Sequence, residues 1–481
     1  MTFFGSSAAP AKLGYAVFTC LVLASAGCTS VVQSGDAAGA KGGQGKVGAE
    51  HVGSVSPAGA AKPGSGPAGA YGMLAAKAPG TLPGTVAAAL ALNERIKSAS
   101  SNLQLAGVNV GIARSGYMPS VYGTGDLGDD GAADAEFVVS QPLLDWGRTK
   151  ADVAKARALE TASKEELAVE RERVALEAAQ AYIGVIRSEA LLALAKDNLS
   201  ALERIAELAQ GLAQGGLGDK SNVEFANVHV GEAGATLEEA DGALVQARSV
   251  YATRVGTQPG TLASLPVIEL GKISDLRAAV DAAPAVVALL ARGEAAGHAA
   301  KTAQAELYPT LAGEAFVRSE DNFGGLVVGA RLRGKTPTYN GASNLMRVEA
   351  AELASDSARS AADAERRQAT ERVAVFQSQA PALKERQTIL AKQLESARAL
   401  RTTYEEQFKL NQRSLTDLVT VQGDVVRIER SLITAKYDYF NLQYSAAEAL
   451  GVLLEKLMGE KRPAQDQIAQ PKPTAQPEKQ G

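Results

Sequence analysis

Cysteine and histidine are scarce in this chain of 481 residues. Its two cysteines, Cys20 and Cys28, both lie near the N-terminus, so no disulfide framework can stabilise the rest of the chain. The histidines His51, His229 and His298 lie far apart in the sequence, which gives no support to a zinc site or a histidine-based catalytic group. The sequence also lacks a phosphate-cradling glycine motif and a nucleophile elbow. We therefore expect no cofactor and no enzymatic activity.

Aromatic residues are also few, at 5% of the chain, and the net charge is only −4. Alanine, leucine, glutamate, glutamine, arginine and lysine dominate the middle of the sequence instead, which is typical of long helices rather than of a large globular core. No basic stripe with interleaved aromatic residues is present, and nucleic acid is therefore not an expected partner.

The first 28 residues have the pattern of a bacterial export signal. Lys12 precedes an apolar stretch, Leu13–Ala26, which is too short to span a bilayer and long enough for a signal peptide. The stretch ends in Leu23-Ala-Ser-Ala-Gly-Cys28, which resembles a lipobox that is cleaved before Cys28 and lipidated there. Ser25 stands where leucine is usual, so cleavage by an ordinary signal peptidase is the alternative. Thr29 after the cysteine resembles the default outer-membrane address of bacterial lipoproteins.

Two segments contain too little apolar surface to fold. Residues 29–80 are rich in glycine, alanine, serine and proline, and are expected to form a flexible tether. Residues 459–481 are rich in proline, glutamine and lysine, and are expected to form a disordered tail. The predicted structured body therefore covers residues 81–458.

The body repeats itself at an offset of 195 residues. Pro142-Leu-Leu-Asp-Trp-Gly147 corresponds to Pro337-Thr-Tyr-Asn-Gly341, with the glycine displaced by one position. Three further landmarks keep the offset: Asn222 with Asp417, Leu237 with Leu432, and Gly256 with Gly451. A register kept over about 115 residues is hard to obtain by chance. We therefore predict two copies of one unit, residues 81–260 and residues 261–458.

Each copy begins with a predicted helix and two short strands. The helices, about 86–116 and 285–307, stop before Pro119 and Pro309, as the geometry of the residue before a proline favours. The predicted strands are 120–124, 135–141, 310–318 and 323–332. In the third, Glu314 and Phe316 alternate with apolar neighbours, and a half-polar strand of this kind fits either a membrane β-barrel or a surface hairpin.

A very long helix and a returning helix complete each copy. Residues 148–214 contain no proline and would be ~100 Å long as one helix, and the second copy is helical to about residue 409. Apolar residues recur at three- and four-residue spacing along the first helix and demand helical partners over its whole length. Glycines in the segment 215–219 predict a tight reversal, whereas the matching segment 410–415 contains none. Returning helices of about 33 residues then lead to Gly256 and Gly451.

The order of these elements resembles the TolC-like outer-membrane channel family of Gram-negative bacteria, over residues 84–458. Three stretches are the most similar to that family: Ser140-Gln-Pro-Leu-Leu-Asp-Trp-Gly-Arg148, Gly216-Leu-Gly-Asp-Lys-Ser-Asn222 and Gln412-Arg-Ser-Leu-Thr-Asp-Leu418. The resemblance implies a mainly α fold with a small membrane β-barrel. In this fold, two repeats of antiparallel coiled-coil helices with two strands each form a homotrimer, which has a 12-stranded β-barrel and a periplasmic α-barrel.

The function that the resemblance implies is a passive exit duct in the outer membrane, lipid-anchored at Cys28, with most of its mass in the periplasm. Such a duct docks to a periplasmic adaptor and an inner-membrane transporter and serves type I secretion or efflux. Gly215, Gly216 and Gly218 form the periplasmic tip turn, either as a docking site for the adaptor or only because the hairpin requires a turn. The alternative function is a structural or adaptor coiled-coil lipoprotein that spans the periplasm. An adaptor would have one helical hairpin between β-rich segments, and this sequence predicts two hairpins.

The resemblance also implies a periplasmic gate at the helix tips. Asp417 resembles an aspartate that forms a carboxylate ring around the threefold axis, and Arg413 resembles an arginine that latches the closed state. Thr420 and Asn222 stand where further aspartates can occur in the family. Compared with members that have those aspartates, this chain is expected to have a weaker latch and a less negative ring. Asp417 is equally consistent with a first-turn carboxylate that the helix dipole stabilises.

Overall fold

The computed structural model describes residues 80–127, 133–268, 270, 276–320, 325–338 and 342–459. All of them belong to one compact unit, Ala70–Gly481. The predicted signal peptide with Cys28, the predicted tether and the predicted tail lie outside the described residues, apart from Gly80 and Gly459 at their edges. Gly341 of the second repeated landmark also lies outside them.

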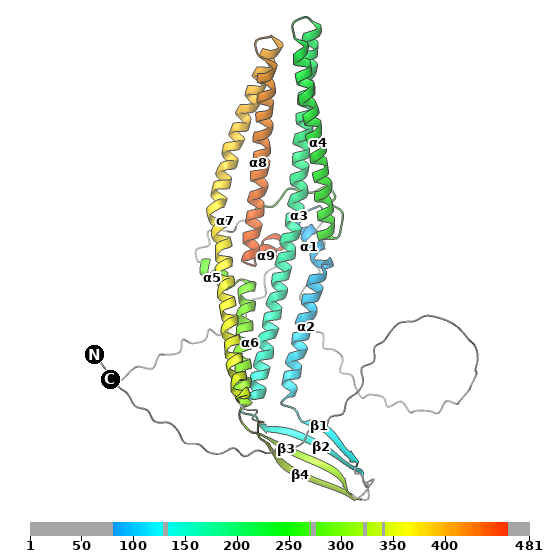
Figure 1. Cartoon of the computed structure of the whole chain (residues 1–481), viewed down its shortest axis with the longest axis vertical. Helices are drawn as coiled ribbons and strands as arrows, with labels where there is room; N and C mark the ends of the chain where they lie inside the picture. Colours follow the sequence, from blue (N-terminus) through cyan, green and yellow to red (C-terminus); the bar gives the residue numbers. More distant parts are fainter. Residues whose placement is uncertain are drawn as a thin grey trace, which may run out of the picture. The chain divides into compact units, whose positions relative to one another are not determined.

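Two helices of 67 residues each dominate the unit, α3 (Arg148–Gln214) and α7 (Ser343–Lys409). Each turns back into a shorter helix, α4 (Lys220–Val255) after α3 and α8 (Leu415–Ala449) after α7. Figure 1 shows the resulting hairpins side by side. Both long helices end where the sequence predicts. The run that forms α3 is rich in alanine and free of proline, whereas α7 continues through Pro381.

The shorter helices pack against these hairpins. They are α1 (Leu82–Leu92), α2 (Glu94–Ser115), α5 (Leu276–Asp281), α6 (Pro284–Ala305) and α9 (Leu453–Met458). Toward the sheet, α2, α3, α6 and α7 pack in that order, each against the next. Further along α3, the contacts are instead with α4 and α8.

The helix predicted over residues 86–116 is wrong in one respect, because Asn93 divides it into α1 and α2. Asn93 has an extended backbone with ψ of 123°, and its side-chain oxygen accepts a hydrogen bond from the Arg95 backbone N–H at 2.9 Å. This side chain therefore caps α2. Asparagine is strongly preferred at such an N-cap position.

Four antiparallel strands form one sheet in the order β1-β2-β3-β4 (Figure 1). They are β1 (Ser120–Leu127), β2 (Ala133–Leu144), β3 (Thr310–Glu320) and β4 (Gly325–Lys335). The first three predicted strands lie inside the observed ones, and the fourth is displaced by two to three residues. Each strand pair leads into helices, so the sheet continues directly from the ends of α2, α3 and α6.

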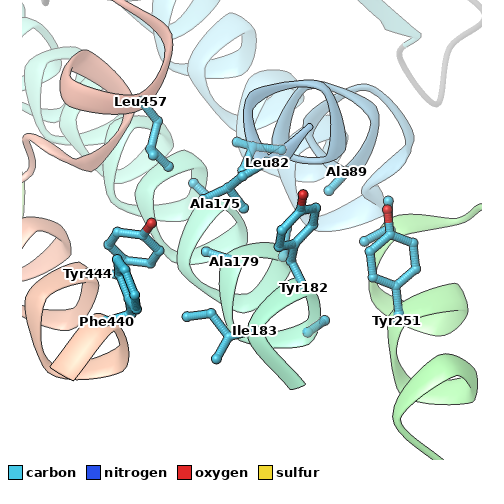
Figure 2. Packing of buried hydrophobic residues seen from close by; sticks show 14 of the residues in the cluster. Leu82, Ala89, Ala175, Ala179, Tyr182, Ile183, Tyr251, Phe440, Tyr444 and Leu457 are labelled. Atoms are coloured by element: carbon cyan, nitrogen blue, oxygen red, sulfur yellow. The ribbon is translucent and has the colours of Figure 1, made fainter. Parts of the chain in front are cut away.

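The largest buried cluster lies where α1, α3, α4, α8 and α9 meet, as Figure 2 shows. Tyr182 of α3 and Tyr444 of α8 are fully buried there. The Tyr182 hydroxyl lies 2.7 Å from the carbonyl oxygens of both Gly80 and Ala263. The Tyr444 hydroxyl donates to the carbonyl of Pro266 at 2.7 Å. These two hydroxyls therefore fix the segment after α4 to the helical core.

Candidate functional site

The sheet has two faces of opposite character. Neighbouring residues of one strand point to opposite faces, and residues that pair across strands share a face. Val121 pairs with Val139, and Val139 pairs with Ala315, which places these residues on one face. The large apolar side chains exposed on this face are Val121, Phe137, Val139, Val317, Leu326, Val328 and Leu332. We call it the apolar face. It agrees with the alternation that the sequence predicts for the third strand.

The opposite face, which we call the charged face, contains an ion network that joins all four strands. Glu314 of β3 is 4% exposed and lies at its centre. Arg331 and Arg333 of β4 donate to its carboxylate from their Nε atoms at 2.7 and 2.8 Å. Arg331 also reaches Glu136 of β2 at 2.9 Å, and the Tyr122 hydroxyl of β1 donates to Glu314 at 3.2 Å.

The sequence alone does not predict this network. Glu314 and Arg331 are direct cross-strand partners, and only the register of β3 against β4 reveals the pair. The alternation of charges in both strands was the available signal, but it does not fix a register. Charge-assisted hydrogen bonds of this kind are stronger than those between neutral groups, so they tie the four strands together on the charged face.

The motif Asp145-Trp146-Gly147 forms the turn between β2 and α3. Trp146 and Gly147 both have positive φ, at 55° and 81°. The Asp145 carboxylate accepts hydrogen bonds from the backbone N–H groups of Gly147 and Thr149, at 3.0 and 2.8 Å. Partial burial raises the pKa of Asp145, but these hydrogen bonds outweigh burial and hold the pKa below its ordinary value. The ionised carboxylate thus caps the first turn of α3.

At the tip of the second hairpin, the structure brings Arg413 and Asp417 together. Arg413 Nη1 lies 3.7 Å from an oxygen of the Asp417 carboxylate, and both side chains are partly exposed. The guanidinium also lies over the ring of Tyr404, 4.4 Å from its centroid, and donates to Gln407 at 3.2 Å. Tyr404 and Gln407 precede the turn, and the sequence pattern at the start of the returning helix does not reveal their contacts with Arg413.

The other predicted gate residues have separate surroundings. The Thr420 hydroxyl donates to the carbonyl of Thr416 at 2.7 Å, within its own helix. Asn222 lies in the first turn of α4, on the other hairpin, where its backbone N–H donates to Asp219. Within the part of the chain that the structure describes, neither residue contacts Arg413 through a hydrogen bond or ion pair.

The two tip turns reverse the chain by different means. At the first tip only Gly216 has positive φ, at 74°, whereas Gly215 has an ordinary helical φ of −76°. A side chain at Gly218 would lie 2.9 Å from the Ala213 backbone nitrogen, so this glycine allows a close approach of the chain. At the second tip Asn411 takes the left-handed conformation with φ of 57°, because asparagine tolerates it best after glycine.

Two other kinds of site are absent from the described segments. No helix among them is both long enough and apolar enough to cross a bilayer. No three histidine, cysteine, aspartate or glutamate residues among them gather as ligands for a metal ion.

Comparison with known proteins decides the family. Residues 85–253 match the family model described as outer membrane efflux protein. The outer membrane efflux protein BepC of Brucella suis biovar 1 (strain 1330) is 25% identical over 415 residues, which cover 82% of this chain and 89% of BepC. These matches support a TolC-like outer-membrane channel. Proteins of that family are outer-membrane efflux channels, which are passive channels rather than enzymes.

Solved structures share the fold of this TolC-like protein. VceC of Vibrio cholerae superimposes with a TM-score of 0.68 at 18% identity, over 77% of this chain and 96% of that one. The open state of the MtrE outer membrane channel of Neisseria gonorrhoeae gives a TM-score of 0.68 at 18% identity, over 78% and 89% of the two chains. The mainly helical architecture with a small antiparallel sheet is therefore that of outer-membrane channels.

Proposed function

We propose that three copies of this chain assemble into an exit duct, in which their sheets close into one 12-stranded barrel through the outer membrane. The two-faced sheet is the observation that carries this proposal. Its apolar face suits lipid and its charged face suits a water-filled interior. The outer strands β1 and β4 each have only one partner in the sheet, and a membrane does not tolerate open edges. Pairing of β1 with β4 of the next copy removes both edges.

The helices support the same assembly. In the row α2-α3-α6-α7, the outer helices α2 and α7 each lack a neighbour on one side. Both carry large exposed apolar side chains, namely Leu105, Val108 and Ile112 on α2, and Leu345, Met346 and Leu353 on α7. Contact between α7 of one copy and α2 of the next would bury these side chains and close a periplasmic α-barrel.

We further propose that the duct is one part of a tripartite export system, either for type I secretion or for efflux. Its hairpin tips, which contain Gly215, Gly216 and Gly218, would dock to a periplasmic adaptor and an inner-membrane transporter. Residues 1–28 would direct export, Cys28 would carry the lipid, and the two repeats, residues 81–260 and 261–458, would form the body. A structural or adaptor lipoprotein, the alternative function, would have no use for a sheet with one apolar and one charged face.

Adjacent positions of β2 test the orientation of the sheet. Val139→Arg places a charge on the apolar face and is expected to cost up to roughly 2–4 kcal/mol in the bilayer. Ser140→Arg places the same charge on the opposite face, where Ser140 pairs with Glu314, and is expected to be tolerated. The measurement is the amount of heat-resistant trimer in outer membranes. Equal losses for the two variants would contradict a membrane barrel with this orientation.

We propose that Asp417 and Arg413 form the periplasmic gate, with Asn222 of the first hairpin and Thr420 of the second as its neutral positions. A single exposed pair such as Arg413 with Asp417 contributes at most about 1 kcal/mol to stability, and the cation–π contact with Tyr404 contributes a similar amount. Three Asp417 carboxylates around one axis would repel each other, and the three arginines would offset that repulsion. The closed state is therefore held by several weak contacts, which suits a gate that must open.

Loss of these contacts is expected to open the tip. The double variant Asp417→Asn, Arg413→Ser should show higher single-channel conductance, and cells that carry it should be more sensitive to vancomycin. The matched control, Asp424→Asn with Arg427→Ser, removes an ion pair of 2.8 Å further along α8 and should change neither. Wild-type behaviour of the tip variant in both assays would overturn the gate assignment.

A further inference from the structure

A pocket of about 540 Å³ lies between α3 and α6, at the end next to the sheet. Its lining combines two aromatic rings with three basic side chains: Trp146, Tyr308, Lys150, His298 and Lys301. The Trp146 and Tyr308 rings pack with their centroids 5.1 Å apart and are 51% and 52% exposed. The Trp146 indole N–H donates to the Pro309 carbonyl at 2.6 Å and so fixes the ring at the junction.

The described residues that line the pocket give it a positive charge. No acidic residue is among the described residues that line it. Lys150 and Lys301 form no ion pair within the segments that the structure describes. Burial and the neighbouring Lys301 lower the pKa of His298, which leaves this imidazole neutral at pH 7, although Glu294 opposes the effect. Two lysine ammonium groups therefore provide the charge.

The pocket opens on the side of the apolar face. A second cavity at the same junction is lined by Arg148 and Glu306, together with Thr310 and Lys335, which belong to the charged face. At about 100° per residue, Lys150 and Arg148 point to nearly opposite sides of α3. The same holds for Lys301 and Glu306 around α6, which are about 140° apart. The two cavities share Ala305 and Tyr308, and the charged side chains that line them project from opposite sides of the α3–α6 pair.

Trimer formation would leave the pocket open. The contacts between copies involve the outer elements of each chain, β1 and β4 of the sheet and α2 and α7 of the helical row. The pocket lies between the inner elements α3 and α6, next to the inner strands β2 and β3. In the assembled duct it therefore faces outward, at the boundary between membrane and periplasm.

We propose that this pocket binds the phosphate of an anionic phospholipid head group in the periplasmic leaflet of the outer membrane. The proposal depends on the orientation of the sheet proposed above. The two lysines would form charge-assisted hydrogen bonds with the phosphodiester. Trp146 and Tyr308 would lie at the interface, where amphipathic rings are favoured, and the acyl chains would continue along the apolar face.

The chain supplies its own reporter, because Trp146 is its only tryptophan. Purified full-length protein in detergent is titrated with short-chain phosphatidylglycerol, short-chain phosphatidylcholine or inorganic phosphate, and the Trp146 emission is followed. We expect a saturable emission change with phosphatidylglycerol at the lowest concentration. An equal response to phosphatidylcholine would contradict the requirement for an anionic lipid. An equal response to inorganic phosphate would show that the pocket binds the free ion and not the lipid.

The double variant Lys150→Gln, Lys301→Gln tests the site itself. It is expected to raise the half-saturating concentration of phosphatidylglycerol roughly tenfold or more, because two charge-assisted contacts are lost. Lys164→Gln with Lys196→Gln, on the same helix outside the pocket, should bind like wild type. Unchanged binding by the pocket variant, or no emission change at all, would overturn the proposal. Because binding is read without a membrane, its failure is distinguishable from the failure of channel conductance.

Discussion

Truncation of Tyr182 to alanine is expected to lower the free energy of unfolding by about 3–5 kcal/mol. The side chain is fully buried in the cluster that joins α1, α3 and α4, so its removal leaves a cavity in a close-packed core (Figure 2). Its hydroxyl also lies 2.7 Å from the carbonyl oxygens of Gly80 and Ala263, and both would lose this partner. Chemical denaturation in detergent micelles measures the change.

Two comparison variants separate the contribution of the cavity to the loss of stability from that of the lost hydrogen bonds. Tyr182→Phe keeps the ring and removes only the hydroxyl, and we expect a loss of about 1–3 kcal/mol from the unsatisfied carbonyls. Leu159→Ala shortens an exposed side chain of the same helix and should change stability by no more than about 0.5 kcal/mol. A loss for Tyr182→Ala as small as that for Leu159→Ala would show that the cluster does not hold the unit together.

Replacement of Glu172 by glutamine is expected to remove a pH-dependent destabilisation of the fold. Glu172 of α3 is 6% exposed, and its carboxylate accepts a hydrogen bond from the Leu454 N–H of α9 at 3.3 Å. Burial raises the pKa of Glu172 to about 8. The hydrogen bond from Leu454 acts to lower this pKa, and the nearby Glu448 acts to raise it further. Burial also raises the pKa of Glu448, although Arg372 opposes it. The native structure therefore holds Glu172 largely protonated at pH 7.

The sign of the effect follows from proton binding. An unfolded chain loses the Glu172 proton near the ordinary glutamate pKa of 4.5, whereas the folded chain keeps it to about pH 8. The folded state therefore binds more protons between these values, and the contribution of Glu172 to stability falls as the pH rises through this window. Above about pH 8 both states are ionised, and the contribution no longer changes.

The variant should therefore differ from wild type mainly at high pH. Glu172→Gln is expected to match wild-type stability near pH 5 and to exceed it by on the order of 2–4 kcal/mol at pH 8. The glutamine oxygen can still accept from Leu454. Glu207→Gln, at a more exposed position of the same helix, should follow wild type at every pH. A constant difference between Glu172→Gln and wild type from pH 5 to pH 8 would contradict the buried, protonated carboxyl.

The sequence predicts the long helices well and the sheet contacts poorly, for physical reasons. Helix length follows from local information, and the absence of proline between Arg148 and Gln214 predicts α3 to its last residue. Strand register depends on a distant segment, so the Glu314–Arg331 pair could not be read from either strand alone. Asn93 lies within an otherwise helical pattern, and only its cap reveals the break.

At the candidate sites too, contacts between residues close in the sequence are predictable, and contacts between distant segments are not. Arg413 precedes the N-cap Ser414 of α8 and Asp417 lies in the first turn, so their closeness follows from their short separation along the chain. The contact of Arg413 with Tyr404 crosses the turn, and no periodicity predicts it. A glutamate in a long helix is ordinarily expected on the surface. Glu172 is buried because its carboxylate caps α9, a short helix that the sequence analysis did not predict.

The most direct test of the account is the conductance of the purified, detergent-extracted protein in planar bilayers. We predict stepwise, long-lived openings, with larger steps for the variant Asp417→Asn, Arg413→Ser. Openings of this kind would establish that the chain forms a pore. Silence from both the wild type and the gate variant, each a well-folded oligomer, would contradict the proposed duct and favour a structural lipoprotein.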